Sequence, residues 1–133
     1  MLEPQKITAG LISGTKKPQS PKSLVWVKPS DIVGDALQQM DELGLSQIPV
    51  LDEGRAVGSL RENRCLAKVV RNRDLLNSPV SEVMENSFPT VDVDVSSNEV
   101  TRRLQTSPAV LVEEYGRIIG IITRHDVLEL KNA

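Results

Sequence analysis

Two stretches of this chain are near copies of each other. Residues 54–58 (GRAVG) recur as residues 116–120 (GRIIG), an offset of 62 positions. The strand expected before the second copy aligns at an offset of 61, with the second turn one residue longer. Internal repetition of this kind is typical of chains that stack copies of one supersecondary unit to bury a shared core. We therefore expect two related halves.

The first half reads as a helix, a hairpin and a second helix. Apolar residues at spacings of three and four predict a helix that Ser30 caps and Gly44 ends. Alternation and turn residues predict the hairpin that follows. These later elements are a strand at 47–51, a turn at 52–54, a strand at 56–60, and a helix with Leu66, Val69 and Val70 in register.

The second half repeats this order. Alternating valines over residues 91–95 predict a short strand, and Ser96 and Glu99 have the spacing of a capping box at a helix start. This helix is about three residues shorter than its counterpart. The remaining elements are a strand at 109–112, a turn at 113–116, a strand at 118–122 and a final helix from His125.

Each half leaves one face of its sheet uncovered, and two copies can cover each other. We predict an α+β fold in which two βαββα repeats pack sheet to sheet with pseudo-twofold symmetry. The predicted segments are an N-terminal short helix and flexible loop at 1–22, the first repeat at 23–76, a linker with a short helix at 77–90, and the second repeat at 91–133.

The inventory of reactive residues argues against catalysis. One histidine and one cysteine are too few for hydrolase triads or zinc sites, so we expect no catalytic residue, metal or cofactor in this chain. A net charge of −2 gives no basic field for nucleic acid. No apolar run approaches the ~20 residues of a membrane helix. No secretory signal stands at Met1, so a cytoplasmic location is expected.

Two motifs beside the strands resemble those of a known family. Residues 48–50 (IPV) match its apolar-Pro-Val strand, and residues 120–126 (GIITRHD) match its Gly-x-x-Thr-x-x-Asp pattern. Val110 stands where the second copy should have its proline. By these motifs the chain resembles a tandem pair of CBS domains, or Bateman module, over about residues 7 to 130. Within the family, it is most similar to the C-terminal regulatory module of cystathionine β-synthase.

The resemblance implies a site for an adenosyl ligand, either S-adenosylmethionine or AMP or ATP. In such modules the aspartate, here Asp126, accepts hydrogen bonds from the ribose diol, and the threonine, here Thr123, contacts the ribose or phosphate side. As an alternative, Asp126 alone, or Thr123, could merely cap the last helix. The expected ligand-binding residues are Leu45, Ser46, Gln47, Ile48, Pro49, Ile122, Thr123, His125 and Asp126.

The corresponding cleft of the first repeat is expected to differ. Arg61 and Arg64 replace the threonine and the aspartate, and a guanidinium cannot accept a hydrogen bond from a diol. We expect this cleft to be empty or to hold an anion. Arg64, Lys68 and Arg71 form a basic stripe that is either a solvated face or a docking surface for an acidic patch. Cys65 is expected in the core.

The main hypothesis is a regulatory module of a pyridoxal-phosphate enzyme of the cystathionine β-synthase type. Its partners would be the adenosyl ligand, the catalytic domain and a second copy, with rotation of the repeats as the switch. A homodimer is expected because the outer helices carry apolar residues on more than one face. The alternatives are a free-standing CBS-pair protein that senses AMP or ATP, and a purely structural dimerisation module with vestigial sites.

Overall fold

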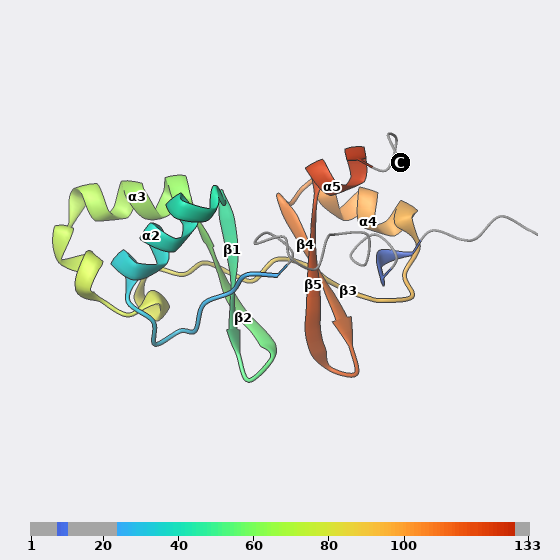
Figure 1. Cartoon of the computed structure of the whole chain (residues 1–133), viewed down its shortest axis with the longest axis horizontal. Helices are drawn as coiled ribbons and strands as arrows, with labels where there is room; N and C mark the ends of the chain where they lie inside the picture. Colours follow the sequence, from blue (N-terminus) through green and yellow to red (C-terminus); the bar gives the residue numbers. More distant parts are fainter. Residues whose placement is uncertain (1–7, 11–23, 130–133) are drawn as a thin grey trace, which may run out of the picture. The chain divides into compact units, whose positions relative to one another are not determined.

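The computed structural model describes residues 8–10 and 24–129 of the chain. They fall into two compact units, one over Leu24–Phe88 and one formed by Pro89–Ala133 with the N-terminal segment Met1–Ser23 (Figure 1). The short helix and loop expected over residues 1–22 lie, apart from 8–10, outside the described residues. Each unit has its own sheet and its own core.

The unit Leu24–Phe88 packs its helices on one side of a hairpin (Figure 1). Val27 adds an isolated parallel bridge to the hairpin. The core contains fully buried Val33, Met40, Ile48 and Leu60. Its elements are α2 (Val33–Leu43), β1 (Gln47–Asp52), β2 (Arg55–Arg61), α3 (Glu62–Arg71) and the 3₁₀ helices η1 (Arg73–Asn77) and η2 (Val80–Glu82).

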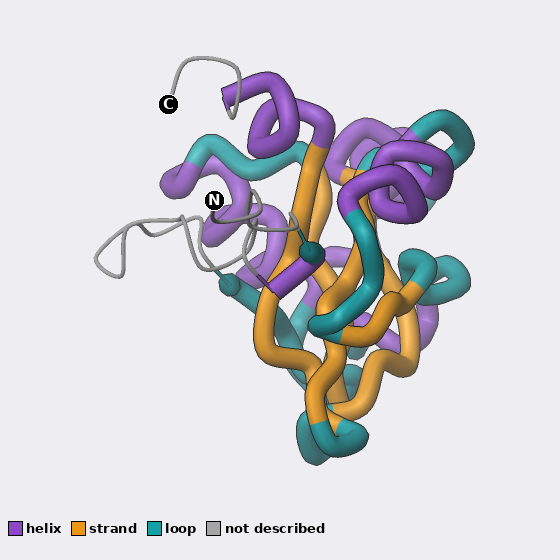
Figure 2. Tube along the Cα trace, turned by 90° about the vertical axis from the view of Figure 1, so that its right-hand side faces the viewer, coloured by secondary structure: helices purple, strands orange, loops and turns teal. Residues whose placement is uncertain are grey.

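The second unit has the same order and a longer first strand. The sheet runs β3–β4–β5, with β3 parallel to β4 and β4 antiparallel to β5. Figure 2 draws the strands of the chain in orange and the helices in purple. Residues 8–10 pack on this unit, since Ala9 N donates to Val95 O at 2.8 Å. Its elements are β3 (Thr90–Asp92), α4 (Ser97–Leu104), β4 (Ala109–Glu114), β5 (Arg117–Thr123) and α5 (Arg124–Glu129).

The two hairpins correspond at one offset throughout. β1 and β4 both have six residues, β2 and β5 both have seven, and each pair is displaced by 62 positions. The turns also match, with φ of 52° at both Glu53 and Tyr115. The expected offset of 61 and the longer second turn are therefore wrong. Apolar strands buried at four consecutive positions align almost equally well when slid by one residue.

This offset changes one motif assignment. Pro49 pairs with Ser59, and the residue at the same place in β4 is Leu111, which pairs with Ile121. Leu111, rather than Val110, thus stands where the second repeat lacks its proline. Leu111 N donates to the carbonyl oxygen of Pro89, the residue before β3, at 2.8 Å. A proline at position 111 could not make this bond because it has no N–H group.

Helix ends agree with the sequence where the capping groups are local. Gly44 has φ of 65° and ends α2 in a Schellman turn, with Leu45 N bonded to Met40 O. Ser30 is not the N-cap, because α2 begins after Ile32, and Val33 N instead donates to Ser78 O at 2.9 Å.

The capping box at α4 is only half formed. Ser96 Oγ accepts from Glu99 N at 3.4 Å, as predicted. The Glu99 carboxylate turns away from Ser96, accepting hydrogen bonds from Arg102 and Arg103. The long guanidinium side chains compete successfully for the carboxylate because they bring a full positive charge.

β3 is shorter, and the buried face of α3 is narrower, than the sequence pattern suggested. β3 covers only three residues of the valine alternation. In α3, Cys65 and Val69 are buried, whereas Leu66 and Val70 are exposed. The helix therefore uses a narrower apolar face than the sequence predicted.

Candidate functional site

Thr123 and Asp126 lie together where β5 passes into α5. The Asp126 carboxylate oxygen Oδ2 accepts from Thr123 N at 2.8 Å and from Thr123 Oγ1 at 3.1 Å. Asp126 N donates in turn to Thr123 Oγ1 at 3.5 Å. The pair thus forms the reciprocal cap that the sequence offered as the alternative to ligand binding.

Capping and ligand binding are compatible uses of the same carboxylate. A carboxylate offers about four lone-pair sites, and each of its oxygens can accept more than one hydrogen bond; both bonds from Thr123 go to Oδ2. Both residues are partly buried, and their mutual bonds fix the carboxylate relative to the end of β5. A group held in this way binds a diol without losing further rotamer freedom.

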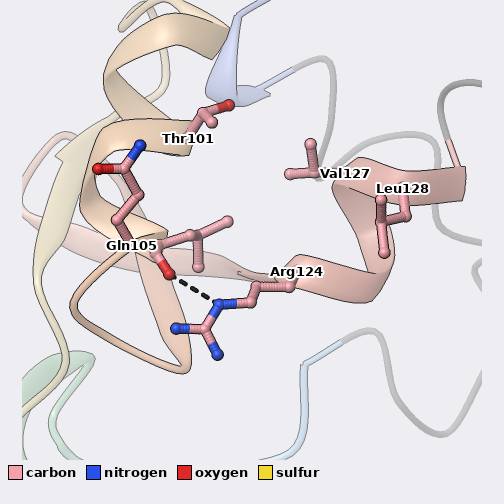
Figure 3. A pocket seen from close by; sticks show the side chains of 6 residues that line it. Thr101, Gln105, Arg124, Val127 and Leu128 are labelled. Atoms are coloured by element: carbon pink, nitrogen blue, oxygen red, sulfur yellow. Dashed lines mark hydrogen bonds between the residues drawn. The ribbon is translucent and has the colours of Figure 1, made fainter.

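The residues next to Thr123 and Asp126 in the sequence differ in burial and in hydrogen bonding. Ile122 is fully buried and packs in the core of its unit. His125 is exposed. Arg124 Nε donates to Leu104 O at 2.8 Å and so closes the last turn of α4 (Figure 3). At least one hydrogen-bond donor of the Arg124 side chain is therefore used within the protein.

The predicted residues of the first repeat form one short stretch at the start of β1. The Schellman turn at Gly44 delivers Leu45 into it, and Ser46 O accepts from Glu62 N at 2.9 Å. Pro49 O accepts from Val27 N at 3.1 Å. Ser46 is exposed, Leu45 and Gln47 are half-buried, and Ile48 and Pro49 are buried. The stretch is held at both ends, with Ser46 exposed and Leu45 and Gln47 partly exposed on either side of it.

These two groups of residues belong to different units, Leu24–Phe88 and Pro89–Ala133. Each group is well ordered by its own local bonds, as described above. That they line one ligand site stays a prediction.

The first repeat has a different arrangement at the corresponding position. Arg61 ends β2 as Thr123 ends β5, and Arg64 takes the place of Asp126. Arg61 is the N-cap of α3 and makes no side-chain cap bond. In the described part of the chain, its Nε is a buried donor without a hydrogen-bond partner. Arg64 Nη1 pairs with Glu85 Oε2 at 2.8 Å. Neither residue offers an acceptor for a ribose.

Sequence reasoning missed a pocket of about 360 Å³ between α4 and α5 (Figure 3). Both helices are short, so their patterns gave no sign of a gap between them. None of the residues expected to bind the ligand lines it. The pocket is lined by Thr101, Leu104, Gln105, Arg124, Val127 and Leu128.

Residues 8–10 and 24–129 provide neither a metal site nor a membrane-spanning helix. No group of three or more His, Cys, Asp or Glu side chains in these ranges could hold a metal ion. Nor does any helix there have the length and apolar character needed to cross a membrane. The thiol of Cys65 is buried, and this burial raises its pKa. Cys65 is a core residue, as expected.

Comparison with known proteins gives one family. The family model for the CBS domain matches the chain twice, at residues 21–71 and 80–132. An inosine-5′-monophosphate dehydrogenase of Aquifex aeolicus is 30% identical in an alignment of 134 positions that covers 96% of this chain. This chain spans only 27% of the length of that enzyme.

Solved structures match over nearly the whole of both chains. An uncharacterized conserved protein from Pyrococcus horikoshii is 27% identical, with a TM-score of 0.74, and the match covers 98% of this chain and 96% of that one. A CBS domain-containing protein of unknown function from Bacillus anthracis has a TM-score of 0.80 at 23% identity, covering 96% and 94%. The second likeness shows the fold alone.

Proposed function

The chain belongs to the CBS-domain family, with two such domains in tandem, and we propose that it is a regulatory module that senses an adenine nucleotide. The observation that carries this proposal is the Thr123–Asp126 pair. It supplies a carboxylate held by two short hydrogen bonds at the junction of β5 and α5. A fixed carboxylate can accept both hydroxyls of a ribose diol. The adenine would lie against the stretch Leu45, Ser46 and Gln47.

We propose further that the module acts as a CBS-pair protein in its own right. The two solved structures described above are of nearly the same length as this chain. Neither they nor the dehydrogenase is a cystathionine β-synthase. These relatives therefore support the general resemblance to CBS pairs. They do not support the more specific resemblance to cystathionine β-synthase.

The choice of nucleotide follows from the same comparison. The expectation of S-adenosylmethionine rested on the likeness to cystathionine β-synthase. Without that likeness, AMP or ATP is the better candidate, in keeping with the free-standing alternative. Binding would favour one arrangement of the two repeats in a homodimer and so change the surface offered to a partner.

Titration of the full chain with AMP, ATP and S-adenosylmethionine tests this function. The readout is the melting temperature, and a ligand at 100 times its Kd adds about 2.7 kcal/mol to the free energy of unfolding. We expect AMP or ATP to raise the melting temperature. In calorimetry, S-adenosylmethionine should compete poorly with either nucleotide for the site. A chain that responds to none of the three is a structural dimerisation module instead.

A further inference from the structure

A basic groove runs along α3 in the unit Leu24–Phe88, whereas the Thr123–Asp126 pair belongs to the other unit. We call it the α3 groove. It has a volume of about 390 Å³, and the proposed nucleotide site does not use it. The residues that line it are Arg64, Ala67, Lys68, Arg71 and Glu85.

The spacing along α3 builds this groove. Arg64, Lys68 and Arg71 are separated by four and three positions, so they share one flank of the helix. Ala67 lies among them, and its single methyl group leaves room above the helix. Exposed Val70 lies on the other flank. Three cations therefore converge on a concave surface.

The groove is not neutralised by its own carboxylate. Glu85 accepts from Arg64 Nη1 at 2.8 and 3.3 Å, which balances one of the three cations. Lys68 Nζ donates to the carbonyl oxygen of Val83 at 2.8 Å, a bond that leaves its charge uncompensated. Within residues 24–129, Arg71 forms no ion pair. The positive charges of Lys68 and Arg71 are therefore available to a bound anion.

We infer that the α3 groove binds a phosphate chain, either as free polyphosphate or as the tail of a nucleotide. Arginine offers a planar fork of donors to phosphate oxygens, and lysine adds a compact charge. The ligand displaces the Glu85 carboxylate from Arg64. The Glu85 backbone stays bonded to Ser59, with both N–H···O distances at 2.9 Å, so the exchange moves only a side chain. The Glu85 carboxylate thus competes with the phosphate chain for Arg64.

The test measures calorimetric binding of sodium tripolyphosphate to the full chain at low ionic strength and neutral pH. Arg71→Gln should weaken binding about tenfold, the effect of losing one hydrogen bond to a charged group. Arg55→Gln is the matched control, because it removes the same charge at the far end of β2, outside the groove. Glu85→Gln should strengthen binding several-fold by removing the competitor.

Equal weakening by Arg71→Gln and Arg55→Gln would show general electrostatic attraction and overturn the site. So would weaker binding in Glu85→Gln that still has the wild-type melting temperature, or no binding at all. Asp126→Asn should leave tripolyphosphate binding unchanged, which separates this site from the proposed nucleotide site. In that variant, competition by ATP but not by adenosine would support recognition through the phosphates. Competition by adenosine would contradict it.

Discussion

At the scale of single residues, Asp126 has two roles that substitution can separate. Asp126→Asn keeps an oxygen that can accept from Thr123 N, whereas Asp126→Ala removes the cap as well. Both variants should weaken binding of AMP or ATP by about 1.5 kcal/mol or more, the scale of a charged hydrogen bond. Only Asp126→Ala should also lower the free energy of unfolding, by about 1 kcal/mol. Calorimetry and urea denaturation measure the two effects.

Arg64→Ala serves as the control for the ribose contact. Arg64 is bonded to Glu85 and stands at the corresponding position of the other repeat. Adenosine binding should therefore be nearly unchanged in this variant. If Asp126→Asn retains full nucleotide affinity, the carboxylate is a helix cap and nothing more.

Gly58 is a second residue where a small change should have a large effect. A Cβ atom added there would lie 2.6 Å from Met84 Sδ and 3.0 Å from Glu85 O. The segment cannot back away, because Ser59 and Glu85 exchange two backbone hydrogen bonds. Gly58→Ala should therefore cost about 2 kcal/mol of stability, as overpacking does.

A double-mutant cycle identifies the cause of that loss. Shortening the partner by Met84→Ala should recover part of the stability lost in Gly58→Ala. Gly116→Ala is the contrasting control. It meets no atom within 4 Å but has φ of +80°, so it should cost about 1 kcal/mol of backbone strain that Met84→Ala does not relieve. Additive costs in the Gly58 cycle would contradict the contact.

At the scale of elements, the first turn of α4 should make stability depend on pH. Hydrogen bonds from Arg102, followed by Arg103, lower the pKa of Glu99 from 4.5 to about 2. A carboxylate whose pKa is lower in the folded state stabilises the fold above its unfolded pKa and loses this effect as pH falls through the folded value. Stability should thus decline between about pH 4.5 and 2.

Urea midpoints measured across this pH range check the effect. Glu99→Gln should flatten the decline, and added salt should reduce it because Glu99 is on the surface. Glu113→Gln is a suitable control, since Glu113 forms no ion pair within the described ranges. Identical profiles for the wild type and Glu99→Gln would show that the ion pairs around Glu99 do not stabilise α4.

Sequence patterns predicted the elements well where the determining contacts are local. Ser96 caps α4 and Gly44 ends α2 through groups only a few residues away. The start of α2 could not be predicted in this way, because its cap is the carbonyl of Ser78, which is distant in sequence. The same limit applies to the site. The Thr123–Asp126 bonds follow from their spacing, whereas the pairing of Arg64 with Glu85 depends on how the chain returns to β2.

At the scale of the whole molecule, the apolar surface that remains exposed bears on assembly. The expectation of a homodimer rested partly on α2, but Val33, Leu37 and Met40 of that helix are buried within their own unit. In the described part of the chain, large apolar side chains remain exposed on several elements. Two of them lie on α3, where Leu66 is 45% exposed and Val70, after Tyr115 the most exposed of the set, is 80% exposed. The face of α3 opposite the basic groove is therefore the surface that a second copy would cover.

We expect a homodimer joined through this face of α3, because a twofold contact brings the same apolar patch together from both copies. Light scattering should give about twice 14.6 kDa at micromolar concentration. Val70→Lys should yield a monomer, since two buried ammonium groups would have no partners. Tyr115→Lys adds the same charge at a 96% exposed turn residue and should leave the dimer intact. A mass near 14.6 kDa for the wild type up to millimolar concentration would contradict the dimer, and with it any switch that depends on rotation of the repeats within a dimer.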